Sequence, residues 1–405
     1  MKTAYIYLNC KHFDGTVFVT QIADWLRLYN AHGIPIRYFH QFYGTEIIKS
    51  SWRKEHLKKI RTVIPNIENV SYSLPSVSFL PYINAFLLYR TLKRKCKGSK
   101  RIVIFSRMLY GKEVAILKKL SKKEIVYIYD ARGASKEEHE YNLSKQGFDN
   151  KKLNKLLRHI MDVERNAVVF ADRIFCVSNT LKNYLCHSYG VDASKFFLYP
   201  CLSDSTKFYY SEELRTIVRK KLCYTSANHV YLYSGGFKNK YHLVGETLSF
   251  LNAVAEKDQD ARFLFLSKDD YQEDELLANY PFLKGKITVK SVANEDVVNY
   301  LNAADYGLLF RDDVKMNNVA SPSKFAEYVL CGLPTIISNG VGDYSDLCVK
   351  ENLGIKIFDF QLTDKIAEKL ISNEFNRRKI ADFGLQNLSK QSKIPMIIEE
   401  FKRYQ

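Results

Sequence analysis

The chain has 405 residues, and 61 Lys and Arg against 44 Asp and Glu give it a formal net charge of +17. A hydrophobic fraction of 46% and a charged fraction of 26% exclude global disorder. No run of about 18 apolar residues occurs, which argues against a membrane-spanning helix, and the apolar run at the N-terminus is too short for a signal peptide. The eight scattered Cys indicate reduced thiols of a cytoplasmic protein and no metal site.

The net positive charge lies in the first half of the chain. Residues 1–205 hold 34 basic and 17 acidic side chains, whereas residues 206–405 are neutral overall. A basic half indicates an anionic partner, which could be nucleic acid, a membrane surface or a phosphorylated ligand. Because no stacking-aromatic motif accompanies the basic clusters, nucleic acid is the weakest of these predictions.

Short apolar segments alternate with helical patterns along the whole chain, beginning with a strand and the helical pattern 17–33 and ending with the helical pattern 386–405. Nearly continuous apolar strands in this arrangement predict parallel sheets covered on both faces, which is a doubly wound α/β fold. A polar stretch places the domain boundary near residue 205. The expected strands are 4–8, 36–42, 101–107, 124–130, 172–178, 229–235, 262–267, 287–292, 306–310 and 334–338.

In such sheets, ligands bind beyond the carboxyl ends of the strands. Gly235 and Gly236 stand at the end of strand 229–235 and precede Lys240. Two glycines, a following helix and a Lys suit a phosphate group, although the same pattern also makes an ordinary strand-to-helix turn. Arg311 directly follows strand 306–310.

A helix start follows Arg311 in the sequence. We expect Ser321 as its N-cap and Pro322 as its first residue, so that its free N–H groups could hold an anion. Lys324 lies in the first turn, and Glu327 lies deeper, where a carboxylate can accept hydrogen bonds from sugar hydroxyls. The alternative is an ordinary capped helix with surface charges.

The first half has its own polar strand ends. Arg107 ends one strand, and Asp130 ends the next strand and is followed by Arg132. These side chains could form a polar site or a buried ion pair that fixes the loop, and the two interpretations are compatible. The sequence Asp258-Gln259-Asp260 resembles a metal-binding motif, but it precedes its strand and therefore lies at the wrong end of the sheet.

Two basic segments stand out in the first half. Residues 47–64 fit a helix with Ile48, Trp52, Ile60 and Ile64 on one side and many Lys and Arg elsewhere. This pattern is typical of a membrane-surface helix, or of an ordinary domain helix with a charged outer face. Residues 93–101, KRKCKGSKR, form a second basic cluster.

Three segments together carry a family resemblance. SPSKFAEYVLCGLPTIISNGVGDYSD (321–346) resembles the donor-site signature of the retaining glycosyltransferases of family four, which have the GT-B fold. YSGGFKNKY (233–241) is similar to their glycine-rich loop, and YDARGASKEE (129–138) is similar to a D-x-R-G segment found in one subgroup. The resemblance extends from about residue 100 to 350.

The resemblance implies an acceptor-binding Rossmann-like domain (1–205), a donor-binding Rossmann-like domain (206–385) and a C-terminal helix (386–405) that packs back on the first domain. The implied reaction transfers a sugar from a nucleotide-diphosphate sugar to a glycan, here expected to be lipid-linked, in polysaccharide synthesis at the cytoplasmic membrane face. No metal or cofactor is expected. The implied diphosphate ligands are Gly235, Gly236, Lys240, Ser321, Ser323 and Lys324, while Glu327 would hold the ribose and Arg311 would point at the donor. We further expect Asp130 and Arg132 to orient acceptor or sugar, and we expect Arg107 to be a catalytic residue beside them.

The sequence departs from the family pattern at two positions. Val319 stands where the first Glu of the E-x7-E pattern belongs, and Gly236 stands where an Arg often follows the first Gly. These departures leave the donor sugar open. Two alternatives stay open. One is an inactive nucleotide-sugar binding module, which the absence of Glu at position 319 supports. The other is a nucleotide-sugar 2-epimerase of the same fold, although the extra acid/base carboxylates and His that it needs are not evident in the sequence.

Overall fold

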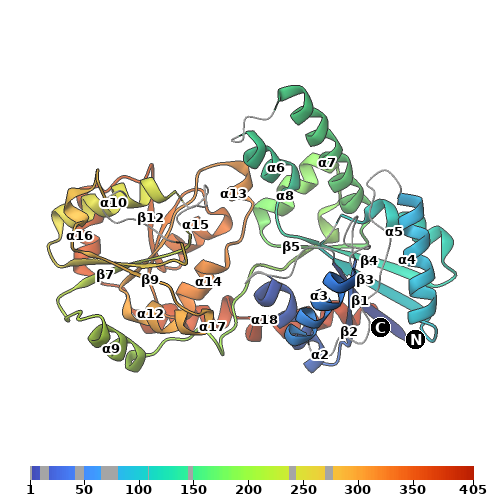
Figure 1. The fold of residues 1–405 in the computed structure, drawn as a ribbon, viewed down its shortest axis with the longest axis horizontal. Helices are drawn as coiled ribbons and strands as arrows, with labels where there is room; N and C mark the ends of the chain where they lie inside the picture. The colour runs from blue at the N-terminus through green and yellow to red at the C-terminus, as the bar shows by residue number, and fades with distance from the viewer. Residues whose placement is uncertain are drawn as a thin grey trace. The chain divides into compact units, whose positions relative to one another are not determined.

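The computed structural model describes residues 2–9, 18–41, 50–64, 81–107, 109–144, 149–236, 243–269 and 277–405. The chain forms two compact units (Figure 1), one made of residues 1–200 and 394–405 and the other of residues 201–393. The predicted boundaries lie a few residues from these positions. No helix within the described ranges combines the length and the apolarity that crossing a bilayer requires.

The first unit is built on a parallel sheet of six strands in the order β2-β1-β3-β4-β5-β6. Parallel pairing places Tyr7 beside Phe105 and Ser106 beside Tyr129, so the carboxyl ends of β1, β3 and β4 meet at one edge. The elements are β1 (Thr3–Asn9), the π-helical turn η1 (Val19–Ala23), α2 (Asp24–Ala31), β2 (Ile36–His40), α3 (Ser50–Val63), α4 (Pro81–Lys95), β3 (Arg101–Ser106), α5 (Gly111–Leu120), β4 (Glu124–Ala131), α6 (Ser135–Ser144), α7 (Asn150–Phe170), β5 (Arg173–Cys176), α8 (Asn179–Tyr189), the 3-10 turn η3 (Ala193–Lys195) and β6 (Phe196–Leu198).

The second unit has a parallel sheet in the order β12-β11-β10-β7-β8-β9. Reversed, this order is the 3-2-1-4-5-6 arrangement of a Rossmann fold. Its elements are α9 (Glu212–Lys221), β7 (His229–Ser234), α10 (Val244–Lys257), β8 (Ala261–Leu266), η5 (Pro281–Leu283), β9 (Ile287–Lys290), η6 (Asn294–Asp296), α12 (Val297–Ala303), β10 (Tyr306–Leu309), α13 (Lys315–Asn318), α14 (Ser323–Leu330), β11 (Thr335–Ser338), α15 (Gly342–Lys350), β12 (Gly354–Ile357), α16 (Asp364–Ser372) and α17 (Arg377–Asn387).

Strand β7 shows why these segments form buried strands. Val230 and Leu232 belong to the core on one face of the sheet, and Tyr231 and Tyr233 belong to the core on the other face. A strand buried on both faces needs apolar residues at every position, which is what the nearly continuous apolar runs supply. The predicted α/β fold is therefore confirmed in both halves of the chain.

The last helix, α18 (Lys390–Lys402), crosses from the second unit back to the first. Phe401 is fully buried there and packs against the rings of Tyr5, Tyr29, Phe105 and Phe175 at centroid distances of 5.1–6.0 Å. Aromatic rings of this size bury much of their surface, so these contacts fix the C-terminal helix on the first sheet. The predicted return of the C-terminal helix is confirmed.

Candidate functional site

The second unit has its topological switch point between β7 and β10, which are neighbours although the chain reaches β8 directly after β7. Ligands of doubly wound folds bind at this position, beyond the carboxyl ends of the strands. Gly235 follows β7 at this edge, and Arg311 follows β10 by two residues. Ser338 Oγ accepts a hydrogen bond from Arg311 N (2.8 Å) and donates to Arg311 O (2.9 Å), which fixes the backbone there.

Helix α14 begins beside this switch point and carries three of the predicted residues. Glu327 is buried, with 7% of its surface exposed. Its two carboxylate oxygens accept hydrogen bonds from Ser323 Oγ (3.2 Å) and from Lys324 Nζ (3.0 Å). The structure thus brings Ser323, Lys324 and Glu327 together as a hydrogen-bonded group in the first two turns of a helix that packs on β10 and β11.

The predicted N-cap is wrong. Helix α14 begins at Ser323, its N-cap residue is Pro322, and no side chain caps it. The hydroxyl of Ser321 instead accepts a hydrogen bond from Cys201 N (3.0 Å) and donates one to the hydroxyl of Tyr344 (2.9 Å). These two tertiary partners hold Ser321 away from the helix N–H groups, so a role for Ser321 at a phosphate would have to compete with them.

The glycine-rich turn is only partly described, because Lys240 and the rest of residues 237–242 lie outside the described residues. The N–H of Gly235 donates to Leu266 O (3.1 Å) and thereby continues the β7–β8 ladder. The Oδ2 atom of Asp269 would lie 2.8 Å from a Cβ atom on Gly236. A carboxylate therefore stands beside the described part of this turn.

Val319 is buried at the end of α13, and the structure thus places an apolar side chain where the family pattern has its first Glu. In the later part of the 321–346 signature, two glycines allow close packing. A Cβ atom on Gly340 would lie 2.4 Å from Asp312 O, and one on Gly342 would lie 2.3 Å from Ala320 O. These two glycines allow the loop after β11 to lie against the segment before α14, which places the start of that helix.

In the first unit, Arg107, Asp130 and Arg132 come together. Asp130 is 1% exposed, and its carboxylate oxygens lie 2.6 Å from Arg132 Nε and 3.6 Å from Arg107 Nε. The predicted buried ion pair is therefore present, with two Arg sharing one Asp. Both Arg side chains keep about one eighth of their surface exposed. They are the parts of this group that a ligand could reach.

Two tyrosines that the sequence analysis did not single out complete this group. The guanidinium of Arg132 lies 4.5 Å above the ring of Tyr199, a cation–π contact, and the hydroxyl of Tyr199 is hydrogen-bonded to that of Tyr29. Burial raises the pKa of Tyr199 and of Tyr29 well above the ordinary value, so both hydroxyls stay protonated. No local motif signals Tyr199, because its contact with Arg132 joins distant parts of the chain.

Helix α3 contains most of the first basic segment, residues 47–64. Leu57, Ile60 and Ile64 are buried in the first unit, while Lys54 and Lys58 are exposed. Residues 47–49 lie outside the described residues. The apolar side of α3 is thus used for packing, which favours a domain helix with a basic outer face over a helix that inserts into lipid.

The segment Asp258-Gln259-Asp260, which resembles a metal-binding motif, has a structural role. Asp258 Oδ2 pairs with His229 Nδ1 (2.7 Å), and its Oδ1 accepts from Asp260 N (2.9 Å), so the Asp258-Gln259-Asp260 segment ties together the amino ends of β7 and β8. Within the described ranges, no three His, Cys, Asp or Glu side chains are grouped closely enough to hold a metal ion.

The fold is similar to solved structures of glycosyltransferases. HepE of Anabaena, solved in complex with UDP, has a TM-score of 0.68 at 13% identity, with 100% of both chains covered. A glycosyltransferase from Rickettsia africae has a TM-score of 0.66 at 13% identity, covering 100% of this chain and 98% of that chain. WaaG, a glycosyltransferase involved in lipopolysaccharide biosynthesis, has a TM-score of 0.60 at 14% identity, covering 98% of this chain and 99% of that chain. No family model and no curated protein matches the sequence. At these identities the similarity shows the fold, which is of the GT-B type.

Proposed function

We propose that this protein is a retaining, metal-independent glycosyltransferase that moves a sugar from a nucleoside-diphosphate donor to a glycan acceptor. The observation that carries this proposal is the buried carboxylate of Glu327, grouped with Lys324 and Ser323 in the first turns of α14 beside the β7–β10 switch point. The resemblance of residues 321–346 to the family-four donor signature and the GT-B fold support it. HepE has been solved with UDP and with UDP-glucose, which makes UDP-sugars the first donors to test.

In the proposed reaction, departure of the nucleoside diphosphate gives the anomeric carbon oxocarbenium character. The N-terminus of α14, Lys324 and Arg311 stabilise the negative charge that develops on the leaving diphosphate. Lys240 would add to this charge. The sequence offers no evident protein nucleophile, so the acceptor hydroxyl attacks from the face that the diphosphate leaves, and a phosphate oxygen takes its proton.

Arg107 and Arg132 are the proposed acceptor-side groups, and Asp130 positions them. Its burial between two guanidiniums makes Asp130 a poor candidate for direct contact with substrate. We place the enzyme at the cytoplasmic face of the membrane, acting on a lipid-linked glycan in polysaccharide synthesis. The support for this placement is the positive charge of residues 1–205.

A ligand-binding experiment tests the donor site without knowledge of the acceptor. Calorimetric titration of the Lys324→Ala variant should show about 10- to 100-fold weaker binding of both UDP and pyrophosphate, because a charge-assisted hydrogen bond to phosphate is lost. The Glu327→Gln variant should weaken the binding of UDP more than the binding of pyrophosphate or 2′,3′-dideoxy-UDP. Loss of the ion pair with Lys324 affects all three ligands, whereas loss of the ribose contact affects UDP alone. Lys350→Ala, which removes an exposed Lys from the same unit, is the matched control.

Equal weakening of UDP and dideoxy-UDP binding in the Glu327→Gln variant would refute the ribose contact. Turnover then separates the candidate activities: a glycosylated acceptor with released UDP indicates transfer, and an epimerised donor indicates a 2-epimerase. Binding of UDP-sugars without either product indicates an inactive binding module. The specific observation in favour of that last candidate is the buried Val319 at a position where the family pattern has a carboxylate.

A further inference from the structure

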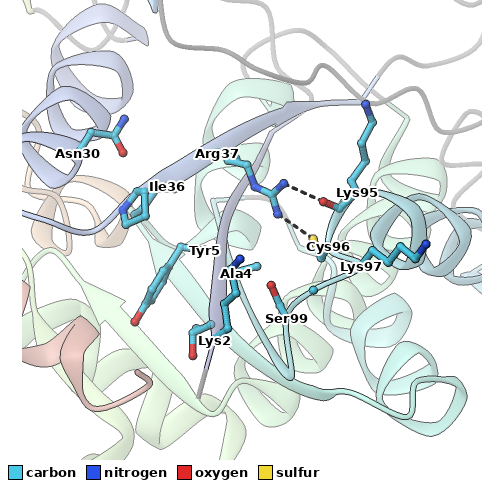
Figure 2. Close-up of a pocket in the computed structure, with 13 residues that line it drawn as sticks. Lys2, Ala4, Tyr5, Asn30, Ile36, Arg37, Lys95, Cys96, Lys97 and Ser99 are labelled. Atoms are coloured by element: carbon cyan, nitrogen blue, oxygen red, sulfur yellow. Dashed lines mark hydrogen bonds between the residues drawn. The ribbon is translucent and has the colours of Figure 1, made fainter.

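A cavity lies in the first unit, at the amino ends of β1 and β2, the opposite end of the sheet from Arg107 and Asp130 (Figure 2). It has a volume of about 730 Å3, within the range of ligand-binding pockets. We call it the basic pocket because four of its lining residues are cationic and none is acidic. Those four are Lys2, Arg37, Lys95 and Lys97, and the rest of the lining is Thr3, Ala4, Tyr5, Asn30, Pro35, Ile36, Cys96, Gly98 and Ser99.

One wall of the basic pocket is held in a fixed shape. The ammonium group of Lys123 donates to the carbonyl oxygens of Cys96 (2.7 Å), Lys97 (3.2 Å) and Ser99 (2.5 Å). Arg37 Nη1 donates to Lys95 O (2.9 Å), which satisfies a carbonyl at the end of α4. These carbonyl oxygens already accept hydrogen bonds. The partial negative charge at the C-terminal end of α4 is therefore compensated and does not repel an anion in the pocket.

Three of the four cations of the pocket have no carboxylate partner among the described residues. Across the described ranges, Lys2, Arg37 and Lys97 have no Asp or Glu within ion-pair distance. The Arg37 guanidinium has five N–H donors and uses two, on Lys95 O and on Cys96 Sγ (2.9 Å), as Figure 2 shows. Burial raises the pKa of the Cys96 thiol, so the sulfur brings no negative charge.

The cations surround the pocket from different segments. The Lys2 ammonium lies 4.0 Å from the position of a Cβ atom on Gly98, so Lys2 reaches across to the turn after α4. Arg37 stands between β2 and this turn, and the ammonium groups of Lys95 and Lys97 are directed away from Arg37 (Figure 2). Long Lys side chains can turn toward an anion that enters.

The geometry points to a second anion site in the basic pocket, one that binds a phosphate group. The Arg37 guanidinium has spare donors, and the ammonium groups of Lys2 and Lys97 have no carboxylate partner within the described ranges. Proteins use such a combination to bind phosphate. The phosphate could belong to a lipid headgroup or to a free phosphorylated molecule. The site is separate from the proposed donor site, which lies in the other unit, and its existence does not depend on sugar transfer.

The test is a calorimetric titration of the full chain with inorganic phosphate at constant ionic strength. The Lys2→Ala/Lys97→Ala variant should bind phosphate at least about tenfold more weakly than the wild type, and Lys2→Arg/Lys97→Arg should retain binding. Lys151→Ala/Lys155→Ala, which removes two exposed Lys of α7 and the same charge, should bind like the wild type. Lys324→Ala weakens phosphate binding at the donor site, so the phosphate binding that remains in this variant belongs to the basic pocket.

The proposal is overturned if the wild type binds no phosphate outside the donor site, or if the pocket variant binds as the wild type does. It is equally overturned if the α7 variant loses as much affinity. Sedimentation with phosphatidylcholine–phosphatidylglycerol vesicles identifies the source. Loss of vesicle binding only in the pocket variant, with phosphate competing, supports a lipid headgroup. Equal vesicle binding by all variants, with phosphate affinity lost only in the pocket variant, supports a free phosphorylated ligand.

Discussion

Replacing Asp130 by Asn tests whether this residue holds the acceptor-side group together. The substitution keeps the shape of the side chain but leaves the guanidiniums of Arg107 and Arg132 without the carboxylate they share. Removing one partner from a buried ion pair costs about 3–5 kcal/mol, because the remaining charge stays desolvated. Against a typical stability of about 5–15 kcal/mol, this is a large loss.

The sequence provides a specific probe for this measurement. The chain has two Trp, at positions 25 and 52, and both belong to the first unit. Trp25 is buried, and its ring centroid lies 5.0 Å from that of Tyr199. The Arg132 guanidinium lies above the ring of Tyr199. Tryptophan emission during urea unfolding therefore reports the unit that contains the substitution, and the other unit does not contribute to the signal.

We expect Asp130→Asn to lower the urea midpoint of the tryptophan transition by about 1–2.5 M, from the loss above and a slope of about 2–3 kcal/mol per M. Glu55→Gln is the control, because its pair with Lys59 (3.1 Å) is exposed on both sides and should contribute less than about 1 kcal/mol. A midpoint shift for Asp130→Asn no larger than that of the control would refute the argument.

A second variant separates stability from function. Replacing all three charged residues by apolar ones, as in Asp130→Leu/Arg107→Met/Arg132→Met, removes every buried charge of the group, and such replacements are often neutral. We expect this variant to be more stable than Asp130→Asn. It should not transfer sugar, because it lacks both Arg. Recovered stability together with full transfer would contradict the proposed acceptor role of the two Arg.

Two further substitutions test packing and titration. Gly111→Ala should destabilise the first unit by about 1–3 kcal/mol, because its Cβ atom would lie 2.1 Å from Asn166 O, whereas Gly133→Ala meets nothing within 4 Å and should be neutral in the same urea assay. The hydrogen bond that His229 Nδ1 donates to the Asp258 carboxylate raises the pKa of His229. The stabilisation from this pair is therefore present below about pH 6.5 and is lost as the pH rises through the raised value. Calorimetry between about pH 6 and pH 9 should show this decline in the wild type and its absence in His229→Gln; an identical pH dependence in both would exclude the pair as its cause.

The fold could be predicted from the sequence because each buried parallel strand needs a nearly unbroken apolar run. The prediction missed β6, whose three residues give too short a pattern, and β12, whose sequence GIKI is interrupted by Lys356 and has no unbroken apolar run. The position of Asp258 was also predictable, because a residue before a strand lies at the amino edge of the sheet wherever the helices pack. These inferences depend only on order along the chain.

The candidate site could be predicted only where its partners are close in sequence. Ser323, Lys324 and Glu327 lie on one short helix, so helical spacing alone brings them together. Ser321 failed as an N-cap because its hydroxyl is held by Cys201, which lies far back in the chain. Tyr199 was missed for the same reason. When contacts with distant residues set the position of a side chain, no local sequence pattern predicts that position.

The structure divides the positive charge of the first half into groups with different chemistry. The two Arg beside Asp130 are partly neutralised and buried, so they suit a small polar ligand. Helix α3 has its apolar side buried and its Lys exposed, so any contact it makes with a membrane must be electrostatic. Such contact weakens steeply as added salt shortens the screening length. Phosphate binding in the basic pocket also uses hydrogen bonds from a guanidinium, and it should therefore survive salt concentrations that release α3 from an anionic surface. Vesicle binding that stays strong in high salt would point to the pocket, and binding that disappears would point to α3.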